Sequence, residues 1–322
     1  MSEAGLVRVA GRLPTEGVEV ITIDGTGKLA RSGKPVQPGD VDPEVFWLSL
    51  DLYRSGQLPA FFGQILSGTR GKWAQSFSAG IDNVAFTRIM QKGLRLTKSS
   101  AQAPAIAEYV MCHALSLLHP IADVRDAQVA HEWKHVSFRE IGSLRWLLVG
   151  FGAIGREIAL RLQPFGAHLT VIRRNTTPEP LAAEVRNTGD LISLLPQSDV
   201  VVLACALNAE TRGLAGQAFF GSMKPGSLLI NIGRGGLVDE AELKSGLDRS
   251  QPAHAVLDVF ETEPLPADAW FWNHPQVRVS AHTSAAGNQV LERGDALFLE
   301  NLRRYRAGDA LLNEAQPAEV GL

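Results

Sequence analysis

One stretch of this 322-residue sequence decides its fold class: LLVGFGAIGREIALRL, residues 147–162. Residues 147–149 are typical of a buried strand and run directly into a glycine loop, and residues 156–162 are expected to form a helix. Glycines in this spacing permit a tight turn, a close approach of the backbone to a pyrophosphate and close helix–strand packing. The phosphates then meet the positive end of the helix dipole. The stretch predicts a dinucleotide-binding loop, and a purely structural glycine turn is the alternative. The residues expected at the dinucleotide are Gly150, Gly152, Ala153, Ile154 and Gly155.

Alternating strands and helices continue this pattern toward the C-terminus. Asp239, with Glu242 three residues later, is typical of a capping box that opens a helix. Apolar strands separated by helices indicate a parallel sheet covered on both faces. The further strands are expected at 169–172, 199–204, 228–232, 256–260 and 277–280.

The flanking sequence indicates a second domain. Two short apolar runs before residue 60 read as strands, at 18–23 and 45–50, and residues 35–43 read as a loop. The helical segment 289–305 follows the last strand and is expected to pack back on this first domain. We therefore expect the chain to cross between domains twice. The expected boundaries are 103–285 for the dinucleotide-binding domain, and 1–102 plus 286–322 for a discontinuous substrate (catalytic) domain.

Composition excludes several other classes of protein. The 31 basic and 34 acidic residues leave a net charge of −3, which argues against a nucleic acid or a membrane surface as partner. The two cysteines form neither a disulfide framework nor a CxxC metal signature, so no metal is expected. The N-terminus lacks the apolar core of a signal peptide, and no run of 18 apolar residues occurs. These features predict a cytoplasmic protein.

The strand after the glycine loop ends in two arginines, Arg173 and Arg174. In an NAD-binding fold, an acidic residue about 20 positions beyond the motif holds the ribose 2′-hydroxyl. Here Arg173 lies near that position, and no Asp or Glu occurs between Glu157 and Glu179. Guanidinium groups form forked hydrogen bonds with phosphate oxygens, so the pair favours NADP(H) over NAD(H). A pair of solvated surface arginines is the alternative.

Three consecutive strands are each followed by a chemically capable residue. Arg234, Glu263 and His282 come after the strands expected at 228–232, 256–260 and 277–280. Parallel sheets bind ligands beyond the carboxyl ends of their strands. Arg234 can bind a carboxylate in bidentate fashion, and His282 can give a proton to a carbonyl oxygen that receives a hydride at carbon. Glu263 can hold the other imidazole nitrogen, which favours the charged, proton-donating form. Taken singly, each residue has a structural alternative: Arg234 could cap a helix, Glu263 could be a solvated loop charge, and His282 could be a buried histidine with its hydrogen bonds satisfied.

Six stretches of the sequence resemble the D-isomer-specific 2-hydroxyacid dehydrogenase family, over roughly residues 70 to 315. In this resemblance the family's Arg, Glu and His fall on Arg234, Glu263 and His282. It implies a doubly wound α/β fold in which a Rossmann domain is inserted into a flavodoxin-like substrate domain. Arg173 in place of an acidic residue is similar to the glyoxylate and hydroxypyruvate reductase branch. The matching stretches are SAGIDN (78–83), APAIAEY (103–109), GFGAIG (150–155), NIGRGGLVDEAEL (231–243), LDVFETEPLP (257–266) and SAHTSAAG (280–287).

The same resemblance implies roles for residues outside these three. The turn Ser78-Ala79-Gly80 would offer backbone N–H groups to the substrate carboxylate, to which Arg234 and His282 would also bind. Asp258 would orient the nicotinamide carboxamide, with a structural strand-end Asp as the alternative. Ala206 and Ile232 would also contact the cofactor. Two departures concern this cofactor region: the family's Thr-Pro-His appears as residues 280–282, Ser-Ala-His, and a common His-x-Pro as residues 204–206, Ala-Cys-Ala.

The resemblance implies an NADPH-dependent reductase that converts a small 2-oxo acid, glyoxylate or hydroxypyruvate, into the D-2-hydroxy acid. A formate-type dehydrogenase is one alternative, although that branch pairs its His with Gln and Glu263 speaks against it. A cofactor-sensing corepressor on the same fold is the alternative from another class. Because the sequence ends soon after the helix at 289–305, no regulatory domain is expected. The helical arm at 121–133 resembles the family's dimerisation element and predicts a homodimer.

Overall fold

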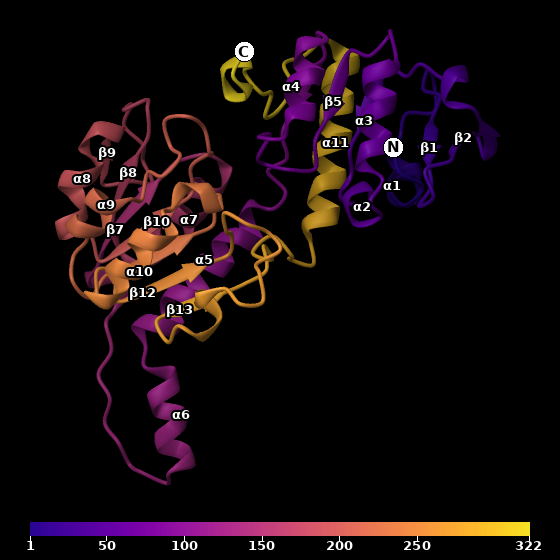
Figure 1. Ribbon diagram of the computed structural model, residues 1–322. Helices are drawn as coiled ribbons and strands as arrows, with labels where there is room; N and C mark the ends of the chain where they lie inside the picture. Colours follow the sequence, from indigo (N-terminus) through magenta and orange to yellow (C-terminus); the bar gives the residue numbers. More distant parts are fainter. The chain divides into compact units, whose positions relative to one another are not determined.

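The computed structural model describes all 322 residues, and its contacts divide the chain into two compact units (Figure 1). One unit comprises Met1–Gln102 and Asn288–Leu322, and the other comprises Ala103–Gly287. The C-terminal helix α11 (Val290–Ala307) thus belongs to the unit that contains the N-terminus. The predicted α/β class is confirmed, because both units contain a parallel sheet covered by helices.

The unit Ala103–Gly287 is built on one seven-stranded, all-parallel sheet in the order β13-β12-β11-β10-β7-β8-β9. Chain order therefore reverses at β7, with β8 on one side and β10 on the other. In open α/β sheets, ligands bind beyond the carboxyl ends of the strands at such a reversal point. The strands are β7 (Arg145–Val149), β8 (His168–Ile172), β9 (Glu184–Arg186), β10 (Val200–Leu203), β11 (Leu228–Asn231), β12 (His254–Leu257) and β13 (Val277–Val279).

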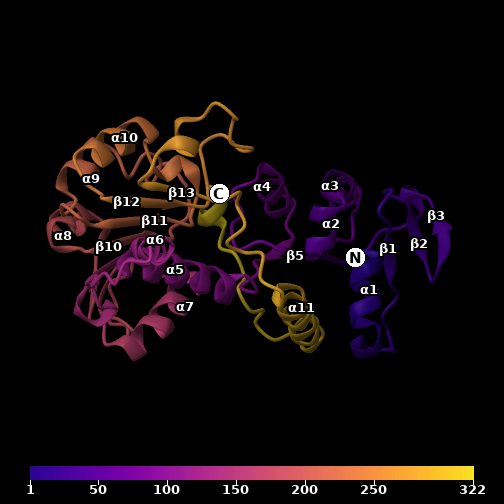
Figure 2. The same ribbon diagram turned by 90° about the horizontal axis from the view of Figure 1, so that it is seen from below.

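Helices cover both faces of this sheet, and the two layers are visible in Figure 2. Side chains alternate along each strand, so Trp146 and Leu148 of β7 join one core while Leu147 and Val149 join the other. The first core includes α5 (Ala103–Leu118) and α7 (Ala153–Leu162). The second includes α8 (Leu191–Leu194), α9 (Gln217–Ser222) and α10 (Glu240–Asp248).

Helix α10 corrects one detail of the sequence prediction. The Asp239 side chain caps the helix by accepting from the backbone N–H groups of Ala241 and Glu242, at 3.0 and 3.1 Å. The Asp239 N–H donates to the carbonyl of Ala215 instead of to a side chain three residues later. Only one half of the expected capping box is therefore formed, because the neighbouring segment already supplies the acceptor.

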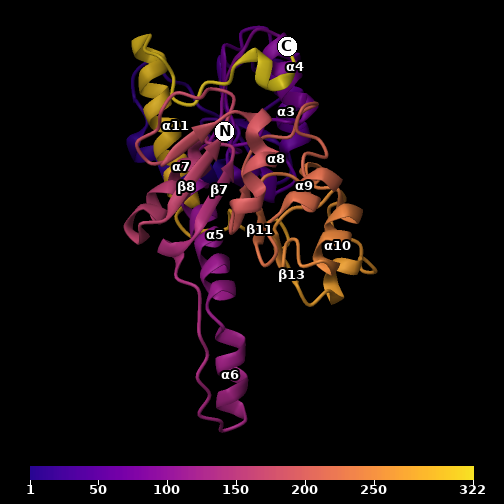
Figure 3. The same ribbon diagram turned by 90° about the vertical axis from the view of Figure 1, so that its left-hand side faces the viewer.

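Helix α6 (Ile121–Val129) extends away from the sheet of this unit, and an extended segment leads back to β7 (Figures 1 and 3). Of its side chains only Ala127 is buried. No single helix of the chain is long and apolar enough to cross a membrane. The pair α5 and α6, bent by 54°, meets the length and composition criteria only when the two are taken together.

The other unit has a small parallel sheet, β4-β5-β6, and a separate antiparallel sheet, β1-β2-β3. Aromatic stacking attaches α11 to the parallel sheet, since the Phe298 ring lies 4.2 Å from Trp47 and 5.9 Å from Trp73 between centroids. This is the packing expected for the last helix. The elements are α1 (Glu3–Val9), β1 (Ile21–Ile23), β2 (Leu29–Arg31), β3 (Lys34–Val36), β4 (Val45–Trp47), α2 (Leu50–Arg54), α3 (Leu58–Ser67), β5 (Trp73–Gln75), α4 (Val84–Gln91) and β6 (Arg95–Thr97).

The antiparallel sheet differs from the sequence prediction. The strand expected at 18–23 begins only at Ile21, and part of the expected loop 35–43 is β3. Strands β2 and β3 are joined by Ser32-Gly33, both with positive φ (49° and 76°), as in the two-residue turns that match the twist of a hairpin. Pro35 is tolerated in β3 because this strand lies at the sheet edge.

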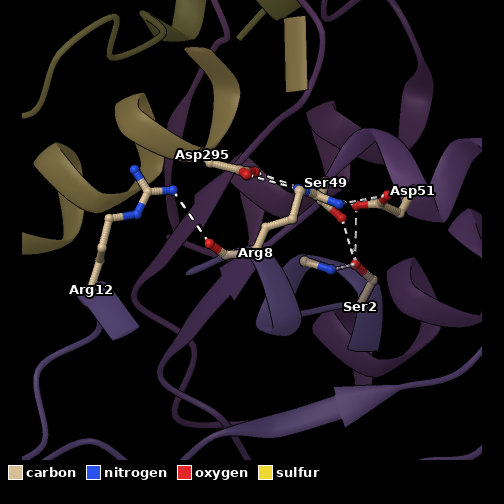
Figure 4. Close-up of polar contacts among 7 residues, drawn as sticks. Ser2, Arg8, Arg12, Ser49, Asp51 and Asp295 are labelled. Carbon is tan, nitrogen blue, oxygen red and sulfur yellow. Dashed lines mark hydrogen bonds and ion pairs between the residues drawn. The ribbon is translucent and has the colours of Figure 1, made fainter. Parts of the chain in front are cut away.

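A partly buried ion cluster joins three helices of the same unit (Figure 4). Arg8 of α1 donates to Asp295 of α11 at 2.7 Å and to Asp51 of α2 at 2.8 and 2.9 Å. The Ser2 hydroxyl caps α1 and lies 2.9 Å from the hydroxyl of Ser49. The two carboxylates neutralise the guanidinium, so this cluster is a clamp between helices rather than an open cationic site.

Candidate active site

The glycine loop after β7 has the geometry that a dinucleotide requires. Gly150 has φ +101°, and a Cβ there would lie 2.7 Å from the backbone of Ala204 and Cys205. A Cβ on Gly155 would lie 2.7 Å from the Gly150 carbonyl, whereas Gly152 has nothing within 4 Å. The first and third glycines are thus required by the loop itself, and the second faces open space at the start of α7. No side chain caps this helix, so its N-terminus suits a pyrophosphate.

Arg173 lies directly after β8, where a Rossmann domain contacts the ribose 2′-hydroxyl or 2′-phosphate of its cofactor. Its guanidinium carbon is 5.5 Å from the centroid of the Phe151 ring, and Arg156 of α7 lies at the same distance from that ring. The Arg173 side chain also donates to the Thr177 carbonyl, and its buried Nε has no partner. The neighbouring Arg174 is exposed. The structure therefore places Arg156, which the sequence pattern did not single out, beside Arg173.

A buried carboxylate, Glu179, also lies at this position. Its side chain is 7% exposed, accepts from Arg156 at 3.0 and 3.3 Å, and lies 3.9 Å from Arg173. Sequence reasoning missed Glu179 because it lies 24 residues after Gly155 in an irregular segment rather than at the strand end. What marks Glu179 as part of this site is its pairing with Arg156 and its closeness to Arg173, and only the three-dimensional structure shows these contacts.

His282 and Glu263 form a direct pair. His282 Nδ1 lies 2.8 Å from Glu263 Oε2, and Glu263 Oε1 accepts from the Phe260 N–H at 2.9 Å. One carboxylate oxygen is therefore fixed by its own loop while the other fixes the imidazole, which leaves Nε2 for a further partner. Both side chains are partly exposed, at 48% and 36%.

Arg234 follows β11, and its loop packs against the loop that carries Glu263. A Cβ on Gly235 would lie 1.8 Å from the Phe260 carbonyl carbon, so only glycine permits this approach. Asn231 shapes the turn, since its side chain donates to the Arg234 carbonyl at 3.0 Å and accepts from the Gly233 N–H at 3.1 Å. Strands β11, β12 and β13 are adjacent, and the three predicted residues therefore leave the same edge of one sheet.

Asp258 has an observed role in the loop after β13. It is 1% exposed and accepts from the N–H groups of Thr283 at 2.8 Å and Ser284 at 3.1 Å, and from the Ser280 hydroxyl at 2.6 Å. Its own backbone carbonyl accepts from the His282 N–H at 2.9 Å. Asp258 thus holds the segment on which His282 lies, and a role toward the carboxamide stays a prediction.

The remaining predicted residues have less distinctive surroundings. The Ala206 carbonyl accepts from the Thr211 hydroxyl at 2.7 Å, and Ile232 is a core residue with 5% exposure. In the other unit, the Ser78 N–H donates to the Ser76 hydroxyl and the Gly80 N–H to the Ser78 hydroxyl. Two of the three N–H groups predicted to bind a carboxylate are therefore already used within their own turn.

The reversed strand order and the glycine loop define a dinucleotide-binding Rossmann domain, and comparisons with known proteins give its family. The sequence profile described as D-isomer specific 2-hydroxyacid dehydrogenase, NAD binding domain, matches residues 111–284. Since this match covers more than half of the sequence, the chain belongs to the D-isomer specific 2-hydroxyacid dehydrogenase family. The matched region is the domain with which that family binds a nicotinamide dinucleotide.

Two relatives and one solved structure illustrate the likeness. Glyoxylate/hydroxypyruvate reductase B of Pectobacterium atrosepticum is 30% identical over 257 residues, 76% of this chain and 78% of the relative. D-3-phosphoglycerate dehydrogenase of Bacillus subtilis is 28% identical over 232 residues, 71% of this chain but 44% of the relative, so the match spans less than half of that enzyme. A D-isomer specific 2-hydroxyacid dehydrogenase from Xanthobacter autotrophicus, solved with NADPH and MES, has a TM-score of 0.77 at 25% identity and covers 95% of this chain and 93% of its own.

Proposed function

We propose that the chain is a cytoplasmic, NADPH-dependent reductase of small 2-oxo acids of the glyoxylate or hydroxypyruvate class, which it converts to D-2-hydroxy acids. The observation that carries this proposal is the pair His282–Glu263 at the sheet edge from which Arg234 also leaves. A fixed carboxylate behind an imidazole is the arrangement of a positioned general acid. The family and the relatives named above support the reaction class.

Arg234, His282 and Glu263 have different tasks in this reaction. Arg234 binds the substrate carboxylate and polarises the neighbouring carbonyl. His282 donates a proton from Nε2 to the carbonyl oxygen, and it then regains a proton from solvent. Glu263 orients the imidazole through Nδ1 and stabilises its positive charge. When bound, the nicotinamide cofactor supplies the hydride that the carbonyl carbon accepts.

The proposed preference for NADPH rests on two basic residues, Arg173 directly after β8 and Arg156 of α7. Arg173 and Arg156 flank Phe151 and give two guanidinium groups for a 2′-phosphate. Glu179 opposes this preference, because its buried carboxylate lies close to both arginines. We infer that the arginines outweigh the single carboxylate, and that NADH is a usable but poorer cofactor.

The experiment that tests this function compares two substrates of similar size. Purified protein with NADPH should reduce glyoxylate and should act poorly on acetaldehyde, which lacks the carboxylate that Arg234 binds. Arg234→Ala should raise KM for glyoxylate and lower kcat, because both binding and carbonyl polarisation are lost. Equal turnover of acetaldehyde by the wild type would contradict the role of Arg234.

A further inference from the structure

A chain of hydroxyl groups leads from helix α5 to the segment that carries His282. The Tyr109 hydroxyl lies 2.7 Å from Ser280 Oγ, and Ser280 Oγ donates to Asp258 Oδ1 at 2.6 Å. A serine hydroxyl has one proton, which here goes to the carboxylate. Tyr109 must therefore be the donor in its contact with Ser280.

The tyrosine is suited to remain a donor. Burial raises the pKa of Tyr109 to about 12, so its proton is retained across the physiological range. The ring is wedged against His113, with the ring centroids 4.2 Å apart, which fixes its direction. Tyr109 is thus a partly buried side chain, packed against its own helix, with its hydroxyl directed at Ser280.

His282 is in a conformation that needs such support. Its φ is +53°, in the left-handed region that costs energy for any residue with a side chain. Strained residues of this kind persist only where surrounding contacts determine them. Here Asp258 supplies those contacts through the N–H groups of His282, Thr283 and Ser284. The residue before His282 is Ala281, whose φ is not fixed by a ring as that of a proline would be, so the other contacts must hold the segment.

We propose that Tyr109 is a positioning residue, which acts through Ser280 and Asp258 to hold His282 in its proton-donating orientation. The contact orders the Ser280 hydroxyl toward Asp258 Oδ1, the oxygen that also accepts from Thr283 and Ser284. This inference rests on the proposed function, because it assigns His282 the role of general acid. Tyr109 itself touches neither substrate nor cofactor in this account.

The test is a set of variants in the full-length protein. Tyr109→Phe should lower kcat for glyoxylate reduction about tenfold, since displacement of a catalytic group by a fraction of an ångström has effects of this order. KM for NADPH should change less than about twofold. Ser280→Ala should be at least as severe, and Ser280→Thr, which keeps the hydroxyl, should restore most of the rate. Because Tyr109 acts through Ser280, Tyr109→Phe should cause no further loss in the Ser280→Ala background.

Tyr305→Phe is the matched control. Like Tyr109→Phe, this variant removes a tyrosine hydroxyl that donates a hydrogen bond, here to Glu44. Burial likewise raises the pKa of Tyr305 to about 12. Tyr305, however, lies in the other unit. It should leave kcat unchanged. Equal losses of kcat in Tyr109→Phe and Tyr305→Phe, or additive losses in the double variant Tyr109→Phe/Ser280→Ala, would overturn the proposal.

A second measurement separates this inference from the proposed function. Amide hydrogen exchange in residues 280–286 reports whether Asp258 still holds the segment, and it requires no turnover. We expect faster exchange in Tyr109→Phe and Ser280→Ala than in wild type or Tyr305→Phe. If the wild type reduces no 2-oxo acid, the proposed function is wrong. Unchanged exchange in Tyr109→Phe would contradict the positioning role whatever the reaction.

Discussion

His282 has a specific combination of contacts: its imidazole is bound to Glu263 while its backbone is held by Asp258. His282→Gln keeps a polar side chain of similar reach but cannot donate a proton in this way. We predict a fall in kcat of about 10²–10⁴, the usual contribution of a positioned acid. Steady-state kinetics with glyoxylate and NADPH measure it, and NADPH binding by fluorescence should be unchanged. A loss of less than about tenfold would show that His282 is not the acid.

We expect the choice between NADPH and NADH to depend on the balance between Arg173 and Glu179. A hydrogen bond to a charged group contributes roughly 1.5–3 kcal/mol, so one good contact with a 2′-phosphate favours NADPH about ten- to a hundredfold in kcat/KM. Arg173→Asp should remove most of this preference, because it replaces the donor by a repelling charge. The measurement is the ratio of kcat/KM for NADPH and NADH. Glu179→Gln should move the ratio in the opposite direction, and no change in either variant would contradict this assignment.

Several residues of the candidate site could be predicted from the sequence, and the reason is physical. Gly150, Arg234 and His282 lie within three residues of the carboxyl ends of β7, β11 and β13, and the common direction of the strands brings such positions to one edge. Glu179 and Tyr109 could not be identified in this way. The first lies in an irregular segment, and the second lies on an apolar helix where a tyrosine is an ordinary packing residue. Their contacts depend on tertiary structure alone.

Asp199, the residue directly before β10, connects this strand to the start of β7 and to Lys224, which precedes β11. The Asp199 carboxylate is 7% exposed and accepts from the Arg145 N–H at 3.0 Å and from Lys224 at 2.7 Å. Burial opposes its charge, but the amide hydrogen bond and the ion pairs with Lys224 and Arg139 outweigh burial, so the pKa of Asp199 is lowered. The carboxylate is therefore a stabilising contact within the Rossmann sheet.

Asp199→Asn should destabilise the protein by about 1–3 kcal/mol at pH 7, because charged hydrogen bonds are lost at a buried site. A lowered pKa means that the contribution is complete above the unfolded value of about 4 and is lost as the pH falls through the folded pKa. The difference between variant and wild type should thus shrink in acid. Urea unfolding at pH 7 and near pH 3, below the unfolded value, measures it, with the exposed Asp268→Asn as control. A difference that grows in acid would contradict the account.

Short strands explain where the fold prediction was wrong. Buried parallel strands such as β7 and β10 read as continuous apolar runs, so their places were predicted to within a residue or two. Strands β1, β2 and β3 have three residues each, too few for an alternating pattern. Pro35 also reads as a loop residue, although an edge strand accommodates it. The antiparallel sheet could therefore be predicted only from its turn at Ser32-Gly33.

The arm formed by α6 predicts that the protein is a homodimer. Large apolar side chains on it and just beyond it are exposed: Val124 by 53%, Val129 by 77% and Trp133 by 94%. A second copy related by a two-fold axis would cover such a surface with the same residues. We predict a dimer at micromolar concentration in light scattering. Val129→Asp with Trp133→Ser should shift it to monomer without loss of the circular dichroism spectrum, and a wild-type monomer would contradict the prediction.

Initial rates on a panel of 2-oxo acids, each with NADPH and with NADH, test the central claim most directly. The panel contains glyoxylate, hydroxypyruvate and 3-phosphohydroxypyruvate, because the relatives include both reductases and phosphoglycerate dehydrogenases. We predict the highest kcat/KM for glyoxylate or hydroxypyruvate, a preference for NADPH of about tenfold or more, and a D-configured product from hydroxypyruvate. Best activity with the phosphorylated acid, equal use of NADH, or no reduction of any member would contradict the account.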